Sequence, residues 1–246
     1  MVCFQIRNNV KTKKMANYFI IGASSGIGKK LAEQLAGEGH RVFGTWFTNN
    51  IQTENEGIEY HQLNVLDENI SFDFLPETVD GLVYCPGSIK LRPFERIKPQ
   101  DFAGDFNLQV VGAIKVIQAV LPKLKKAENP VIVLFSTVAV QNGFNFHSQI
   151  SASKGAIEGL TKALAAEFAP KIRVNCIAPS LTDTPLAAPL LNTEQKMEAN
   201  AQRHPLKRIG KTEDLANAAA FLLSEKSGWI TGQIIHVDGG MSTLKV

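Results

Sequence analysis

Residues Asn17–Leu35 read N-Y-F-I-I-G-A-S-S-G-I-G-K-K-L-A-E-Q-L, and this stretch decides the fold. Its first part, Tyr18–Ile21, is a short apolar run typical of a buried parallel strand. Three glycines follow within Gly22–Gly28, and apolar residues then recur at helical spacing. A strand, a glycine-rich turn and a helix in this order favour a dinucleotide site, because the backbone can approach a pyrophosphate at the helix N-terminus.

The rest of the chain alternates apolar runs with amphipathic segments. We expect further strands at residues 41–45, 58–65, 81–85, 131–135, 172–178 and 233–237, and further helices at 99–124, 151–168 and 212–223. Residues 179–200 contain prolines and no clear period, which is typical of a mobile flap over a site. The alternation predicts an α/β fold with a doubly wound parallel sheet of about seven strands. We expect a single domain over residues 15–246, preceded by a disordered extension at residues 1–14.

The composition is that of an ordinary globular protein. The chain has 246 residues, of which 44% are hydrophobic and 20% charged, and its formal net charge is +3. This balance gives no reason to expect a nucleic-acid or membrane partner. Its cysteines, Cys3, Cys85 and Cys176, are odd in number and lack metal-ligand spacing. We therefore expect a reducing, cytoplasmic compartment, with neither a disulfide framework nor a metal site.

Several further motifs follow the glycine loop in a fixed order. Asn64-Val65 comes after the third expected strand, and Tyr84-Cys85-Pro86-Gly87 after the fourth. Pro179 to Thr184 reads P-S-L-T-D-T, and V-D-G-G stands near the end. Each motif alone is weak, but the ordered set is specific. From about Ala16 to Met241, the chain resembles the short-chain dehydrogenases/reductases, most closely the bacterial β-ketoacyl-(acyl carrier protein) reductase branch.

The resemblance implies a Rossmann fold, a nicotinamide dinucleotide cofactor and hydride transfer between a carbonyl and an alcohol. It implies these cofactor-binding residues: Gly22, Ser24, Ser25, Gly26, Ile27, Gly28, Thr45, Asn64, Val65, Cys85, Gly87, Lys154, Pro179 and Thr184. It also implies three catalytic residues: Lys154, Thr137 at the position of the family's serine, and Asn107 at that of its asparagine.

The end of the second expected strand indicates which cofactor is bound. An NAD site usually has a carboxylate there to accept from the ribose 2′-hydroxyl. Gly44-Thr45-Trp46 has none. Thr45 and Ser24 can donate to a 2′-phosphate, and Arg41 or Lys29 are the cations within reach. We expect NADP, with NAD as the alternative.

The resemblance breaks at the proton donor. In the family, a tyrosine and a lysine four residues later lie one helical turn apart, and the lysine lowers the pKa of the tyrosine that protonates the substrate. The matching segment here is I-S-A-S-K, with Lys154 in place and Ile150 at the tyrosine position. The flanking residues match without a gap. The chain's own tyrosines, Tyr18, Tyr60 and Tyr84, fall on expected strands away from this helix.

Two interpretations stay open. The chain is an oxidoreductase for 3-oxoacyl-thioester-like substrates with weak or atypical activity, with Lys154, His147 or a water held by Asn107 supplying the proton. Alternatively, it is a non-catalytic NADP-binding subunit or a regulatory partner of an active paralogue. An engineered inactivating change at Ile150 is a third possibility. The resemblance also implies a homo-oligomer, either a dimer or a tetramer, and it allows a hetero-oligomer with an active paralogue.

Overall fold

The computed structural model describes residues 14–48 and 55–245. The extension predicted for residues 1–14 falls outside this part of the chain, apart from Lys14. The ammonium of Lys14 lies 2.8 Å from a carboxylate oxygen of Glu128.

Within the described residues, seven strands form one sheet in the order β3-β2-β1-β4-β5-β6-β7, and every neighbouring pair is parallel. The strands are β1 Asn17–Ile21, β2 Arg41–Trp46, β3 Ile58–Gln62, β4 Gly81–Tyr84, β5 Val131–Phe135, β6 Arg173–Pro179 and β7 Ile234–Val237. The order runs outward in both directions from β1 and β4, which is the doubly wound arrangement that the sequence predicted.

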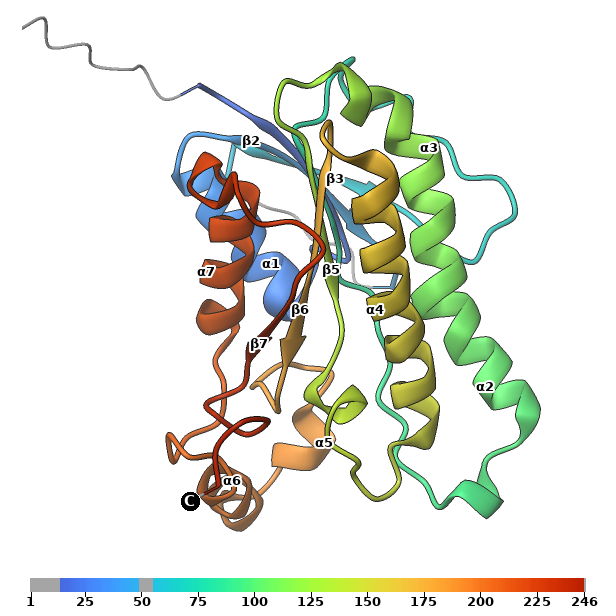
Figure 1. Ribbon diagram of the computed structural model, residues 1–246, viewed down its shortest axis with the longest axis vertical. Coiled ribbons are helices and arrows are strands. Elements are labelled where there is room, and N and C mark those ends of the chain that lie inside the picture. Colours follow the sequence, from blue (N-terminus) through green and yellow to red (C-terminus); the bar gives the residue numbers. More distant parts are fainter. Residues whose placement is uncertain (1–13, 49–54, 246) are drawn as a thin grey trace, which may run out of the picture.

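Helices cover both faces of the sheet (Figure 1). One face carries α1 Gly26–Gly37 and α7 Thr212–Leu223, and the other carries α3 Gly112–Lys126 and α4 Ser148–Phe168. The helix α2 Pro99–Phe106 continues into α3 through a π-helical turn at Asn107–Val111. Two short helices, α5 Ala188–Leu191 and α6 Glu194–Gln202, lie together at one end of the molecule.

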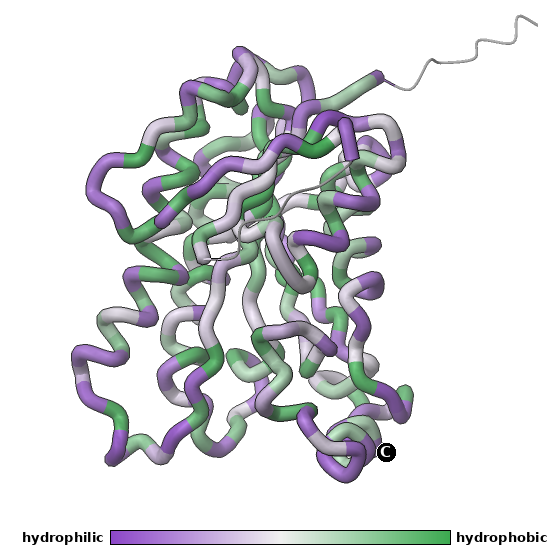
Figure 2. The backbone as a smooth tube through the Cα atoms, turned by 180° about the vertical axis from the view of Figure 1, so that it is seen from behind, coloured by the Kyte–Doolittle hydropathy of each residue, from purple (hydrophilic) through white to green (hydrophobic). Residues whose placement is uncertain are grey.

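The core consists of two apolar layers that share the sheet. All five residues of β5 are buried, and they alternate between the layers: Ile132 and Leu134 pack toward α3 and α4, whereas Val131 and Val133 pack toward α1 and α7. Each such side chain contributes about 1.5–3 kcal/mol by leaving water. Figure 2 shows hydrophobic segments through the centre and hydrophilic ones recurring along the outer helices and loops. The sheet is therefore a rigid support for whatever lies at its ends.

Three sequence predictions need correction. The third strand ends at Gln62 rather than at residue 65. The expected helix over 99–124 contains the π-helical turn, which periodicity alone does not reveal. The expected flap contains two helices, because the Thr193 hydroxyl accepts from the backbone N–H of Lys196 and so caps α6. None of the helices in the described part of the chain is long and apolar enough to cross a membrane.

Candidate active site

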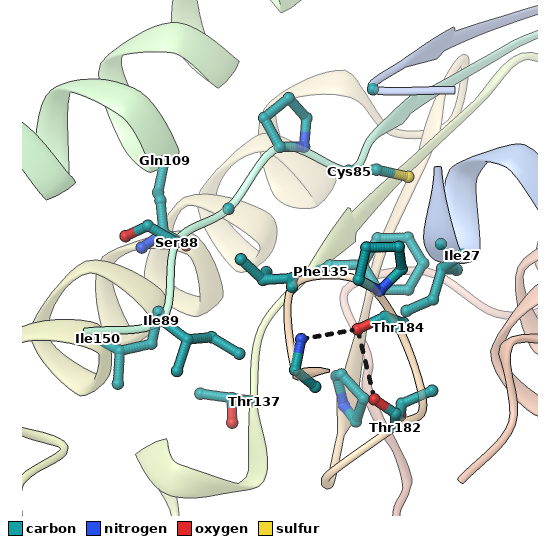
Figure 3. A pocket seen from close by; sticks show the side chains of 18 of the residues that line it. Ile27, Cys85, Ser88, Ile89, Gln109, Phe135, Thr137, Ile150, Thr182 and Thr184 are labelled. Atoms are coloured by element: carbon teal, nitrogen blue, oxygen red, sulfur yellow. Dashed lines mark hydrogen bonds between the residues drawn. The ribbon is translucent and has the colours of Figure 1, made fainter. Parts of the chain in front are cut away.

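The carboxyl ends of the strands open into a large cavity of about 990 Å³. Its walls come from the loops that follow β1 to β6, the first turns of α4, and the segment between β6 and α6. In Figure 3, Thr137 lies between Ile89 and Ile150 on one side and Ile27 and Thr184 on the other. Doubly wound sheets bind their ligands at this edge. Every site residue that the sequence predicted lines this cavity, except Asn107.

The glycine loop after β1 has a conformation that side chains would disturb. Gly22 and Gly26 have φ angles of 77° and 54°, in the left-handed region. A Cβ atom on Gly28 would lie 2.3 Å from the carbonyl oxygen of Gly22. The Thr45 hydroxyl accepts from the Gly22 N–H at 3.0 Å and ties the loop to β2. Small residues are required here because backbone packs directly on backbone.

The N-terminus of α1 faces the cavity with its backbone donors uncapped. No side chain caps this end of the helix at Ser25, and its first turn contains no acidic residue. The first N–H groups of a helix lack intrahelical partners, and the helix dipole adds positive potential there. Together with the loop, this end of α1 fits a pyrophosphate group.

The side chain of Thr45 also connects β2 to the glycine loop. It is buried, and its oxygen is turned toward the Gly22 N–H rather than toward the open end of β2. Trp46 and Phe47 continue the cavity wall beyond it.

Asn64 and Val65 form the wall beyond β3. Val65 is buried, and Asn64 shapes the turn that follows, with its amide donating to Asp67 at 2.6 Å and its oxygen accepting from the Leu66 N–H at 3.1 Å. Leu63, Val65 and Leu66 around this turn give the cavity an apolar wall. Such a surface suits a planar ring.

Lys154 projects from α4 into the cavity. Its side chain is only 8% exposed, and its Nζ donates to the carbonyl oxygen of Phe135 at 2.8 Å. Burial lowers the pKa of Lys154 to about 8, and the charge of Asp105 acts in the opposite direction. Gly87 leaves space beside the ammonium, because a Cβ there would lie 3.9 Å from Nζ. The ammonium keeps further N–H donors for a ligand.

Thr137 and Ser136 follow β5, and the structure separates their roles. Ser136 is buried and donates to Glu158 at 2.6 Å, which ties it to α4. Thr137 lines the cavity, and its oxygen accepts from the Ala139 N–H at 3.3 Å. Its hydroxyl proton stays available to a carbonyl oxygen. Of the two neighbours, Thr137 is therefore the one placed to orient a substrate.

Ile150 lies one turn before Lys154 on α4 and lines the same cavity. It is 8% exposed and has nothing that donates or titrates. None of the tyrosines in the described residues lines the cavity. The hydroxyls of Tyr84 and Tyr60 donate instead to the backbone oxygens of Leu108 and Ala23.

The prediction of Asn107 as a site residue is not supported by its position. It is exposed and lies outside the cavity lining, whereas Gln109 lines the cavity and is fully buried. The motif match chose the first amide of N-L-Q, whereas in the π-helical turn at Asn107–Val111 it is the second amide, Gln109, that lines the cavity. The amide of Gln109 donates to Asp105 at 2.7 Å, and its Oε1 is buried without a partner in the described residues. Such an acceptor indicates a bound water or ligand group.

Asp105 fixes the orientation of this amide. Its carboxylate is buried and accepts from Gln109, from Ser153 at 2.6 Å and from Ser88. Because all three contacts come from donors, the ionised carboxylate satisfies them well. Sequence reasoning missed this cluster, and its one signal was the i, i+4 spacing of Asp105 and Gln109.

The segment after β6 closes the cavity from the other side. A Cβ on Gly26 would lie 3.4 Å from the Thr184 methyl group, so this segment rests on the glycine loop. The Thr184 hydroxyl contacts the Thr182 carbonyl oxygen at 3.4 Å and accepts from the Ala187 N–H at 3.3 Å (Figure 3). Ser180 and His204 also line the cavity here, and the sequence predicted neither. In the described part of the chain, no three His, Cys, Asp or Glu residues are grouped to hold a metal ion.

A glycine loop at a helix N-terminus, a buried lysine and a threonine hydroxyl around one cavity define a dinucleotide-binding oxidoreductase fold. Residues 22–242 match the profile of the family described as enoyl-(acyl carrier protein) reductase. The chain belongs to this family of short-chain dehydrogenases/reductases.

Known proteins of two activities are similar to this chain. It is 34% identical over 237 residues to a 3-oxoacyl-(acyl-carrier-protein) reductase of Thermotoga maritima, covering 90% of this chain and 96% of that protein. It is 32% identical over 229 residues to the L-xylulose reductase of Bos taurus, covering 90% and 94% of the two chains.

Solved structures share the fold. The ligand-free aldohexose dehydrogenase of Thermoplasma acidophilum superposes with a TM-score of 0.84 at 25% identity, covering 94% of this chain and 96% of that chain. ElxO with NADP bound superposes with a TM-score of 0.82 at 26% identity, covering 94% and 100% of the two chains. A form of ElxO with one tyrosine replaced by phenylalanine has NADPH bound, with a TM-score of 0.82.

Proposed function

We propose that this chain binds NADP(H) and transfers hydride to or from 3-oxoacyl-thioester-like carbonyl or alcohol substrates, weakly or atypically because the usual proton donor is missing. One observation carries the proposal: Lys154 is in place in the cavity, and the position one turn before it is Ile150.

The cavity fits the cofactor. The glycine loop and the N-terminus of α1 would hold the pyrophosphate, the turn at Asn64-Val65 the adenine, and Lys154 the nicotinamide ribose. When bound, the cofactor supplies the hydride of the reaction. The unpaired Gln109 oxygen shows that the cavity is built for a polar occupant as well as an apolar one.

NADP is the cofactor we assign. In the described lining, Trp46, Phe47 and Thr48 follow the buried Thr45, and none is a carboxylate that repels a 2′-phosphate. ElxO, which is similar to this chain, has been solved with NADP bound. The free thiols of Cys85 and Cys176 fit a reducing compartment, and we place the protein in the cytoplasm.

The chemistry that remains follows from the residues present. Thr137 orients the carbonyl, and Lys154 holds the cofactor and adds positive charge. Loss of a positioned general acid costs roughly 10²–10⁴ in rate, or about 3–5.5 kcal/mol at the barrier. Proximity to the cofactor still contributes. Turnover is therefore expected, but well below that of a tyrosine-bearing relative.

The second candidate is a non-catalytic subunit that binds NADP and supports an active paralogue. The observation that favours it is again Ile150, since every other part of the cofactor site is kept. We expect a homo-oligomer, a dimer or a tetramer, and a mixed assembly with a paralogue under this second candidate.

Two measurements separate these possibilities. NADPH and NADH are titrated by fluorescence, and β-ketoacyl thioesters are then offered with NADPH. Binding of NADPH with slow turnover supports the proposal, and binding without any turnover supports the non-catalytic subunit. Failure to bind either cofactor refutes the assignment of the glycine loop.

A further inference from the structure

Ser180 and His204 form a hydrogen-bonded pair in the wall of the cavity. Ser180 directly follows β6, and His204 comes shortly after α6. The Oγ of Ser180 lies 2.8 Å from the Nε2 of His204, and the Nδ1 of His204 lies 2.8 Å from the carbonyl oxygen of Asn200. His204 is only 2% exposed, so packing also fixes the ring. A hydroxyl, an imidazole and an orienting oxygen in sequence form an arrangement suited to proton transfer.

The Asn200 carbonyl oxygen determines how the proton is held. Because a carbonyl oxygen only accepts, the Nδ1 of His204 carries a proton. In the neutral imidazole, Nε2 then accepts from the Ser180 hydroxyl. In the imidazolium, Nε2 donates to the Ser180 oxygen, and the serine proton is free to bond elsewhere. The pair can therefore take up or deliver one proton at Ser180.

This proton lies at the catalytic end of the cavity. The strands β5 and β6 are neighbours, with Phe135 beside Ile177. Thr137 and Ser180 lie two and three residues beyond this pair, on strand ends whose spacing is about 4.8 Å. Both residues line the same cavity as Lys154. The serine hydroxyl thus faces the compartment in which the general acid is missing.

A smaller cavity of about 300 Å³ adjoins the pair, and Ser180 and His204 line both cavities. The Nε2 of His236 lines this smaller cavity and is buried without a partner in the described residues, which indicates a water site. Water there can exchange protons with the pair. Besides His204 itself, the titratable or charged side chains that line the smaller cavity are Arg208, Asp214, His236 and Asp238, and those that line the larger one are Cys85, His147, Lys154, Lys196 and Arg203.

We propose that Ser180 is the catalytic residue that exchanges a proton with the substrate oxygen, and that His204 is the positioning residue that recharges it. This inference rests on the proposed function and names the proton donor of that site. As the carbonyl carbon is reduced by the hydride that the cofactor supplies, its oxygen forms an O–H bond with the Ser180 proton. The Ser180 oxygen takes the Nε2 proton of the imidazolium, and the neutral His204 takes its next proton from water. Oxidation of an alcohol runs the same transfers backwards.

For the other two side-chain candidates, Lys154 and His147, the described residues supply no hydrogen-bonded side chain that could return a proton. Lys154 donates to the Phe135 carbonyl oxygen, and the Nδ1 of His147 has the Asn145 carbonyl oxygen as its partner at 2.7 Å. In the described part of the chain, the hydrogen-bond partner of each of these two groups is a backbone carbonyl oxygen. Ser180 is backed by an imidazole and, beyond it, by a second cavity.

The test compares Ser180→Ala in two backgrounds, the unaltered chain and Ile150→Tyr. We expect Ser180→Ala to lower kcat by about 10² in the unaltered chain, as loss of a general acid does. In the Ile150→Tyr background, where a tyrosine supplies the proton, we expect a loss of less than about threefold. If Ser180 had only a structural role, Ser180→Ala would lower kcat by the same factor in both backgrounds. Ser71→Ala and His61→Gln, which lie outside both cavities, serve as controls.

His204→Gln is tested by pH profiles and by NMR. In the unaltered chain, the pH dependences of reduction and of oxidation are expected to run in opposite directions, because reduction needs the imidazolium form of the pair and oxidation the neutral form. Both dependences flatten in His204→Gln and in Ser180→Ala. The ¹⁵N shifts of His204 in the cofactor-free protein are expected to show the Nδ1–H tautomer, with the signal identified by its loss in His204→Gln.

Equal losses in both backgrounds, unchanged turnover in Ser180→Ala, or an Nε2–H tautomer would each overturn the inference. So would an unaltered chain that binds NADPH but shows no turnover, because Ser180 would then deliver no proton. Failure to bind NADPH is a separate result, which counts against the proposed function itself.

Discussion

The substitution Gly28→Ala tests whether the glycine loop holds the cofactor. The added Cβ would lie 2.3 Å from the Gly22 carbonyl oxygen and 3.3 Å from the Ala23 Cα. Real Cβ atoms essentially never approach closer than 3.0 Å, so the loop must move by at least 0.7 Å, the difference between 3.0 and 2.3 Å. The obstacle is backbone, which cannot rotate away as a side chain can.

The magnitude follows from this displacement. Overpacking of this kind costs about 1–3 kcal/mol of folding stability. If a similar amount is lost from binding, the Kd for NADPH rises by roughly fivefold to 150-fold, since a factor of ten corresponds to about 1.4 kcal/mol. Urea unfolding measures the first effect, and fluorescence titration with NADPH measures the second.

Gly37→Ala is the matched control in the same helix. A Cβ on Gly37 has nothing within 4 Å, so the change is expected to stabilise α1 by up to about 1 kcal/mol and to leave NADPH binding unchanged. If Gly28→Ala binds NADPH as tightly as the unaltered chain does, the loop does not approach the pyrophosphate and the reasoning is wrong.

Three further substitutions address charge and polarity in the cavity. Burial lowers the pKa of Lys154 to about 8 in the folded chain, below the ordinary lysine value of 10.5. The unfolded state therefore binds more protons between these two values, and the free energy of unfolding rises with pH there. In urea unfolding, the free energy of unfolding of the unaltered chain should rise by about 3 kcal/mol relative to that of Lys154→Met between pH 8 and 10.5. A difference between the two chains that stays constant with pH would contradict the burial of the ammonium. Trp46→Asp adds a carboxylate at the end of β2 and should weaken NADPH binding at least tenfold relative to NADH, whereas an unchanged ratio of the two titrated Kd values would place the 2′-phosphate elsewhere. Asp105→Asn replaces a carboxylate oxygen by an amide N–H₂ group, which cannot accept from both Ser153 and Gln109. We expect it to lower the free energy of unfolding in urea by about 1–3 kcal/mol. An unchanged midpoint would show that these hydrogen bonds are dispensable.

The sequence predicts the sheet because short apolar runs recur along the chain, with amphipathic helical segments between most of them. It also predicts most of the cavity lining, since the glycine loop and the strand ends must meet at one edge of a parallel sheet. Lys154 by itself identifies Ile150 as the position of the missing tyrosine, because residues four apart lie one helical turn apart.

What the sequence did not predict depends on local geometry. The motif match placed the site amide at Asn107, whereas the structure leaves Asn107 exposed and puts Gln109, two residues later, in the cavity lining. The partnership of Ser180 with His204 joins residues 24 positions apart, and it forms only because α6 folds back over the end of β6. Neither fact follows from periodicity or spacing.

The central claim is that Ile150 is what limits turnover in an otherwise complete cofactor site. The most direct measurement is kcat/KM for a β-ketoacyl thioester with NADPH, compared among the unaltered chain, Ile150→Tyr and Ile150→Phe. Phenylalanine supplies the ring without the hydroxyl, so it separates proton donation from packing. We expect Ile150→Tyr to gain about 10²-fold or more and Ile150→Phe to gain nothing. Equal rates in all three chains would contradict the account.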